Sequence, residues 1–139
     1  MQYRIKDNLI VIIMEDGENF TENIKKMVTV KNFPSTAVVV SALGMLKNIK
    51  LGYFDGKEYI LHEIKGPSEL LGISGVMTKG TDPSFHFHII IGDENGHTFG
   101  GHLMEAFVCN VVEMFLLPSS IKLKRVPRGK LKILDFEEN

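Results

Sequence analysis

The sequence predicts an α+β domain in which one principal helix packs beside a mainly antiparallel, twisted β-sheet of seven or eight strands. Only one segment, residues 18–31, places apolar residues at helical spacing. The rest of the chain alternates short β-branched, apolar runs with turn residues such as Gly, Pro, Asn and Asp. The length of 139 residues fits one domain.

The first part of the chain predicts a strand, a turn and the helix. Residues 9–14 form a β-branched apolar run typical of a buried strand, and the turn residues 15–17 follow. The helix is expected over residues 18–31, with Asn19 or Thr21 as its N-cap. The apolar face of this helix is expected to consist of Phe20, Ile24, Met27 and Val28.

The middle of the chain predicts strands separated by turn residues. In order, the expected strands are residues 37–43, 47–54, 57–64, 69–77, 85–91, 97–104 and 107–117. Asp55-Gly56 is a strong hairpin turn, and Gly44 and Pro118 are expected to end their strands. Residues 121–136 alternate weakly and are expected to form an edge strand or a flexible arm.

The composition argues against several protein classes. No apolar stretch approaches the ~20 residues needed to span a membrane, and the chain begins without the apolar run of a secretory signal. Cys109 is the only cysteine, so no intramolecular disulfide can form and we expect a reduced, cytoplasmic protein. The net charge of -1 argues against a general nucleic-acid binder.

The charge is uneven along the chain. Residues 118–139 carry six Lys and Arg residues against three Asp and Glu residues, whereas the remaining residues carry ten against fourteen. We therefore expect an α+β domain at residues 1–118 and a basic C-terminal strand or arm at residues 119–139. If the protein binds nucleic acid, the expected contacts are Lys122, Lys124, Arg125, Arg128 and Lys130.

The most specific chemical pattern is a pair of histidines two residues apart. Because strand side chains alternate between faces, His86 and His88 share one face of their strand. A three-residue loop at Glu94-Asn95-Gly96 places His88 opposite His102, whereas a two-residue loop turns His102 toward the apolar face. Three neutral imidazoles form a suitable ligand set for Zn²⁺, or for Ni²⁺, Co²⁺ or Fe²⁺, with one position open for water, substrate or a carboxylate.

Other interpretations of the histidines stay open at this point. The three grouped histidines could be ordinary, half-exposed residues of a sheet. His97 is expected to be solvated in its turn, and His62 to lie at a surface or an interface. The sequence contains no Ser/His/Asp pattern, nucleophile elbow or phosphate loop, so it assigns no catalytic residue.

Five motifs carry a resemblance to a known family. They are Gly17-Glu18, residues 51–59, residues 69–75, His86-Phe87-His88 and Gly100-Gly101-His102-Leu103. In this order they resemble the plants-and-prokaryotes-conserved (PPC) domain, of the stand-alone prokaryotic type, over residues 5–117. The domain is also known from plant AT-hook DNA-binding proteins. The resemblance implies an antiparallel α+β fold, a homotrimer, and a metal held by His86, His88 and His102.

The chain departs from the plant members of the family at two places. Their Gly-Arg-Phe-Glu-Ile-Leu stretch contacts transcription factors; here Gly66, Glu69 and Leu71 match, but Pro and Ser replace Arg and Phe. The segment 127–131 is the nearest to an AT-hook, but it has Lys130 in place of Arg and Leu in place of Pro.

The sequence therefore predicts a trimeric, metal-binding domain, with zinc as the first choice of metal. Two alternatives stay open. One is a DNA-binding or transcription-regulatory protein that uses the basic C-terminal residues, and the other is a non-catalytic protein-interaction module.

Overall fold

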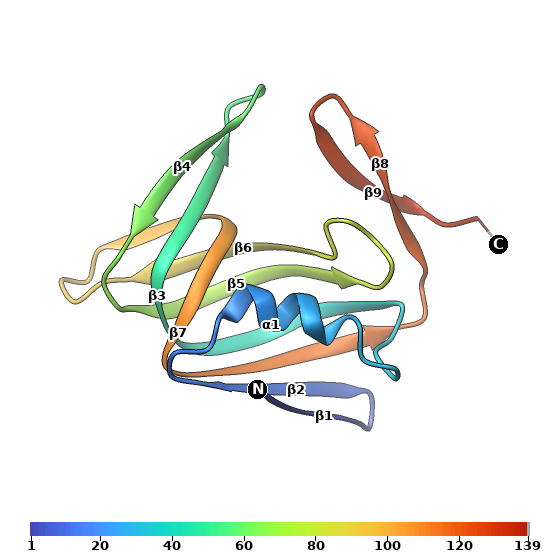
Figure 1. Ribbon diagram of the computed structural model, residues 1–139, viewed down its shortest axis with the longest axis horizontal. Coiled ribbons are helices and arrows are strands. Elements are labelled where there is room, and N and C mark those ends of the chain that lie inside the picture. The colour runs from blue at the N-terminus through green and yellow to red at the C-terminus, as the bar shows by residue number, and fades with distance from the viewer. Residues whose placement is uncertain (139) are drawn as a thin grey trace.

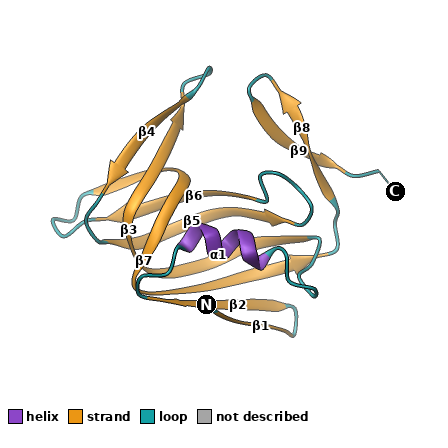
Figure 2. Cartoon of the chain, in the orientation of Figure 1, coloured by secondary structure: helices purple, strands orange, loops and turns teal. Residues whose placement is uncertain are grey.

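Two long strands, β3 (Thr36–Phe54) and β7 (Thr98–Ser119), organise the computed structural model, which describes residues 1–138 (Figure 1). The other elements are β1 (Gln2–Lys6), β2 (Leu9–Glu15), α1 (Phe20–Met27), β4 (Tyr59–Ile64), β5 (Ser68–Thr78), β6 (Phe85–Gly92), β8 (Leu123–Arg128) and β9 (Leu131–Phe136). Strands dominate these residues, beside one short helix (Figure 2). The predicted α+β class is confirmed.

The main sheet curls because both long strands pair with several neighbours. Its seven strands follow the order β1-β2-β7-β6-β5-β3-β4, and β3 pairs with β7 as well. Strands β3, β5, β6 and β7 therefore form a closed ring of antiparallel pairs. The core fills the space between the curled sheet and α1, where the rings of Phe20 and Phe87 lie 6.4 Å apart between centroids.

The helix is shorter than the sequence predicts. It begins after Asn19, whose side chain accepts a hydrogen bond of 3.0 Å from the backbone N–H of Glu22. It ends at Met27, and turns rather than α-helix occupy the residues after it, where the Thr29 hydroxyl donates to the Lys26 carbonyl at 2.7 Å. The expected end near residue 31 is therefore wrong, because local side-chain and turn hydrogen bonds replace the last helical turn.

Two expected strand breaks are also wrong. The expected strands 37–43 and 47–54 are one strand, β3, and the expected strands 97–104 and 107–117 are one strand, β7. Gly44 lies inside β3 with φ +137°, where a Cβ atom would overlap the carbonyl oxygen of Val111. Gly44 thus permits a bulge where β3 crosses β7, instead of ending the strand. Pro118 also lies within β7, which ends at Ser119.

The C-terminal residues form a hairpin outside the main sheet. Strands β8 and β9 pair only with each other among the described residues, and the pair Arg128–Leu131 closes a two-residue turn at Gly129-Lys130. Gly129 has φ +59°, a backbone conformation that favours glycine. The hook-like segment 127–131 is the tip of this hairpin. Among residues 1–138 no helix has the length and apolar character needed to cross a membrane.

Candidate metal centre

The β6–β7 hairpin sets the positions of the three histidines. The backbone N–H of Asp93 donates to the His97 carbonyl at 2.9 Å, which leaves a three-residue loop with Gly96 at φ +78°. This loop pairs His88 with His102, as the sequence predicts. The alternating burial of β6 directs Phe87 into the core and leaves His88 exposed.

The structure brings the three imidazoles together into one cluster. The Nε2 atoms of His86 and His88 lie 3.1 Å apart, and the ring of His102 lies 4.8 Å from that of His86 between centroids. One ring nitrogen from each of the three residues lies within 4.8 Å of the others. The grouping inferred from the strand register is therefore present.

Tyr59 and Gly52 hold His102 in place, and the sequence analysis did not assign them to the site. The Tyr59 ring stacks on the His102 ring with centroids 4.9 Å apart and planes 29° apart. Gly52 pairs with His102 in the sheet, and a Cβ atom there would lie 2.8 Å from the Tyr59 ring. A side chain at position 52 would thus displace the ring that supports His102. The motif at residues 51–59 contains both residues and was the sequence signal that could have assigned them to the site.

Burial keeps two of the imidazoles in their neutral form. Burial, with smaller effects from the neighbouring His86 and His88, lowers the pKa of His102 to about 4. Burial also lowers the pKa of His86, with smaller effects from His88 and Arg125. A neutral imidazole has a lone pair for a metal ion, so His86 and His102 need to lose no proton on binding at neutral pH.

One pair of ring nitrogens in the cluster has the spacing of two ligands on one metal ion. Zn–N bonds of about 2.0–2.1 Å place two ligand nitrogens about 3.3 Å apart, close to the 3.1 Å between His86 and His88. The Nδ1 atom of His102 is buried and has no hydrogen-bond partner among residues 1–138. A buried polar atom without a partner is unfavourable in a folded protein, and this one belongs to one of the three clustered histidines.

Comparisons with known proteins agree with this fold. A family model described as the Plants and Prokaryotes Conserved (PCC) domain matches residues 1–120. The chain belongs to this family, which is the PPC family that its sequence motifs resemble. A PPC protein of solved structure from Pyrococcus horikoshii is 29% identical with a TM-score of 0.79, and the match covers 99% of this chain and 96% of that chain. A search of curated protein sequences gave no match.

Two further solved structures share the fold of this PCC-domain protein. A metal-containing protein from Archaeoglobus fulgidus is 24% identical with a TM-score of 0.78, and the match covers 99% of this chain and 97% of that chain. A candidate DNA-binding protein from Bacteroides thetaiotaomicron is 19% identical with a TM-score of 0.86, covering 99% of this chain and 98% of that one. At these identities the likeness establishes the fold alone.

The basic C-terminal residues of this PCC-domain protein do not form one face. Alternation along β8 places Arg125 on the face opposite Lys124 and Arg128, both of which are exposed. Lys122 precedes the strand and Lys130 lies in the turn that follows it. The sequence groups these residues as nucleic-acid contacts, and the hairpin places them on different faces and in its turn.

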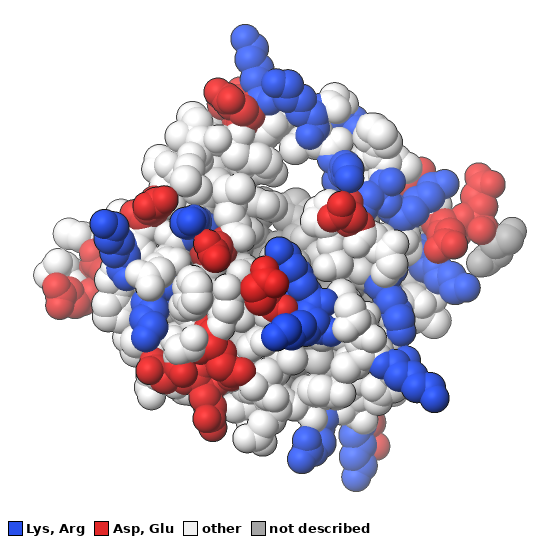
Figure 3. Space-filling view, in the orientation of Figure 1, with Lys and Arg blue, Asp and Glu red and all other residues white. Residues whose placement is uncertain are grey.

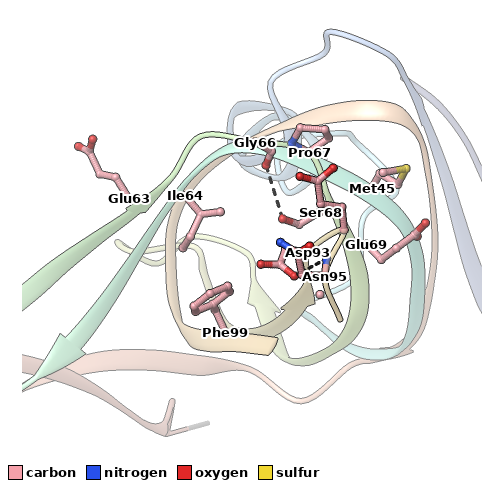
Figure 4. Close-up of a pocket in the computed structure, with 12 residues that line it drawn as sticks. Met45, Glu63, Ile64, Gly66, Pro67, Ser68, Glu69, Asp93, Asn95 and Phe99 are labelled. Atoms are coloured by element: carbon pink, nitrogen blue, oxygen red, sulfur yellow. Dashed lines mark hydrogen bonds between the residues drawn. The ribbon is translucent and has the colours of Figure 1, made fainter. Parts of the chain in front are cut away.

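The residues matching the plant interaction stretch lie at a different place in the PCC domain. Gly66 and Glu69 line a hollow of about 610 Å³, whereas Leu71 lies outside its lining and is exposed (Figure 4). No histidine is among the residues that line this hollow. The carboxyl groups in its lining belong to Glu63, Glu69, Asp93 and Glu94. The acidic hollow is therefore separate from the histidine cluster.

Proposed function

We propose that this protein binds a divalent metal ion, with zinc as the first choice, through His86, His88 and His102. The observation that carries the proposal is the cluster of three histidines, each of which has a ring nitrogen within 4.8 Å of the others. Three imidazoles leave one position open on a four-coordinate ion, as in zinc sites that bind water or a substrate.

The chain's own residues would hold the metal and shape its surroundings. A three-histidine Zn²⁺ supplies Lewis acidity and lowers the pKa of bound water to about 7. The stacked ring of Tyr59 fixes the orientation of His102, and Gly52 leaves room for that ring. The apolar side chains behind His86 and His88, including Phe87, anchor β6 in the core.

Metal analysis of protein purified without a polyhistidine tag tests this proposal. We expect close to one metal ion per chain in the wild type and a large loss in His88→Ala. His97→Ala is the matched control, because His97 is exposed in the adjacent loop with its Nδ1 atom 3.7 Å from Asp93. Wild-type protein without metal, and without a thermal shift on adding Zn²⁺, would overturn the proposal.

We propose further that the protein assembles as a homotrimer, as the family resemblance implies. Apolar side chains on the outer side of β3 and β7 support an interface there. They are Val38, Val40, Leu43 and Leu117, each 45–62% exposed. A pair across the two strands, Val38 and Leu117, makes this surface continuous. An exposed apolar patch of this kind is typical of a protein–protein interface.

DNA binding is a second candidate, which the exposed side chains of Lys124 and Arg128 on β8 favour. Affinity for an AT-rich duplex should then fall steeply with salt, because phosphate contacts release counterions. Exchanging Lys124 and Arg128 for Gln should weaken binding, whereas exchanging Lys25 and Lys26 on α1 should not. Absence of binding at low salt would reject this candidate.

A further inference from the structure

The C-terminal hairpin brings a guanidinium group next to the histidine cluster. Arg125 donates from Nε to the Pro83 carbonyl and from Nη1 to the Lys132 carbonyl, each at 3.3 Å. Its Nη2 atom is buried and has no hydrogen-bond partner among residues 1–138. Burial also lowers the pKa of Arg125. A buried cation with an unused N–H pair is the donor that a carboxylate or phosphate would satisfy.

A cavity of about 470 Å³ lies between this hairpin and the histidines. His86, His102 and Tyr59 line it from the main sheet, and Arg125 and Lys130 line it from the hairpin. The space-filling view is hollowed between the β3–β4 tip and the C-terminal hairpin (Figure 3). The volume lies within the range of small-molecule sites.

The charges that line this cavity have one sign. Arg125, Lys130 and Lys132 contribute cations, and no Asp or Glu of the described chain is among the lining residues. Lys132 lies 3.9 Å from the carboxylate of Asp82 and also donates to its carbonyl at 3.3 Å. Lys132 therefore ties the hairpin to the loop before β6. Lys130 has no ion-pair partner among residues 1–138, so it and Arg125 are available to an anion.

We propose that this cavity binds a small organic anion whose carboxylate or phosphate group is held by Arg125 and Lys130. The body of the ligand lies against the apolar part of the lining. That part consists of Leu131, Ile133, Leu134 and Pro83. The inference rests on the proposed metal site in one respect, since an oxygen of the anion would occupy the open metal position beside His86 and His102. The contact with Arg125 itself needs no metal.

The anion-binding half of the cavity is supplied by a separate part of the chain. The family model ends at residue 120, whereas Arg125 and Lys130 lie in the hairpin that follows β7. The histidines thus lie within the residues that the family model matches, and the cationic groups lie in the hairpin after them.

Calorimetric titration of the full-length, zinc-loaded protein with phenyl phosphate and with benzoate tests the proposal. The two probes share an aromatic body and differ in the anionic group, and phenol is the uncharged control. We expect at least one anion to bind, phenol not to bind, and Arg125→Gln to weaken anion binding at least about tenfold, as loss of a charge-assisted contact implies. Lys130→Gln should weaken it less, and Arg128→Gln, on the opposite face of β8, should leave it unchanged.

Each outcome has a separate meaning. Three outcomes would overturn the anion site. The wild type does not bind either anion at millimolar concentration, phenol binds as the anions do, or Arg125→Gln leaves anion binding unchanged. Metal content measured on the same samples reports on the histidines alone, and it should be equal in wild type and Arg125→Gln. If no sample holds metal but Arg125→Gln still loses anion affinity, the metal proposal fails and the anion site stands. Thermal unfolding of each variant, with Lys130→Gln as the milder change, separates loss of the site from loss of the fold.

Discussion

Gly75 determines how closely β5 can approach His86. Its backbone has φ +149°, and a Cβ atom at this position would overlap the carbonyl oxygen of His86 and lie 2.7 Å from the ring of Phe87. Gly75→Ala should therefore lower the free energy of unfolding by about 3 kcal/mol, from backbone strain and overpacking together. It should also reduce metal content, because His86 must shift. Urea unfolding and metal analysis measure the two effects.

Gly72→Ala is the control for this prediction. Gly72 lies on the same strand, and a Cβ atom there would meet nothing within 4 Å. Gly72→Ala should lower the free energy of unfolding by less than about 1 kcal/mol. Equal effects of the two substitutions would show that the contact with His86 does not limit position 75.

The metal-free protein should lose stability as the pH falls from 6.5 toward 4. The pKa of His102 is lowered from 6.5 to about 4 by burial and by His86 and His88, so above pH 6.5 both folded and unfolded chains hold a neutral ring. Below pH 6.5 the unfolded chain binds a proton that the folded chain resists, and the free energy of unfolding falls until about pH 4. Urea unfolding of chelator-treated protein across this range measures the loss.

His102→Gln should remove part of that dependence on pH. The carboxyl groups with lowered pKa values are Asp16, Glu18 and Asp55, and they act from about pH 4.5 downward because their ordinary values are 3.8, 4.5 and 3.8. A difference in stability between wild type and His102→Gln that stays constant from pH 6.5 to 4 would contradict the assignment to His102.

The grouping of the histidines was predictable from sequence, whereas their supporting residues were not. Alternation along β6 and the loop at Gly96 depend on neighbouring residues in the chain, so the pairing of His88 with His102 follows from local rules. The motif at residues 51–59 contains Tyr59, but no local pattern shows its contact with His102 or the approach of Arg125, because both depend on distant strands.

At the scale of elements, contacts between distant strands also explain why the sequence analysis divided β3 and β7 into two strands each. Gly44 was expected to end a strand because glycine weakens strand interiors. In the structure it continues one, because the crossing of β3 and β7 leaves no space for a Cβ atom beside Val111. The sequence shows the glycine but not the strand that lies against it.

The helix depends on its N-terminal cap. The Asn19 side chain accepts hydrogen bonds from the Glu22 N–H at 3.0 Å and from the Thr21 hydroxyl at 2.9 Å. Asn19→Ala should therefore lower the free energy of unfolding by about 1 kcal/mol, whereas Asn19→Asp should keep most of the cap's contribution to stability. Chemical denaturation of both variants tests this. Equal destabilisation by Ala and Asp would mean that the cap contributes little.

At the scale of the whole molecule, the small net charge conceals two segments of opposite sign. Lys and Arg side chains gather over the C-terminal hairpin in the space-filling view, with some acidic side chains among them (Figure 3). The sequence showed this division, but it could not show that Arg125 turns toward the histidines. The fold converts a basic segment into part of the wall of a cavity.

The proposed trimer makes a prediction about size in solution. The wild type should have about three times the 15.6 kDa mass of one chain by light scattering. Val40→Lys should reduce that mass, because Val40 is 62% exposed on the outer side of β3 and a charge there is costly to bury in an interface. Phe136→Lys is the matched control, since Phe136 is 69% exposed but lies on the C-terminal hairpin. A wild type with the mass of one chain would contradict the trimer. A trimer that Phe136→Lys breaks and Val40→Lys does not would place the interface elsewhere.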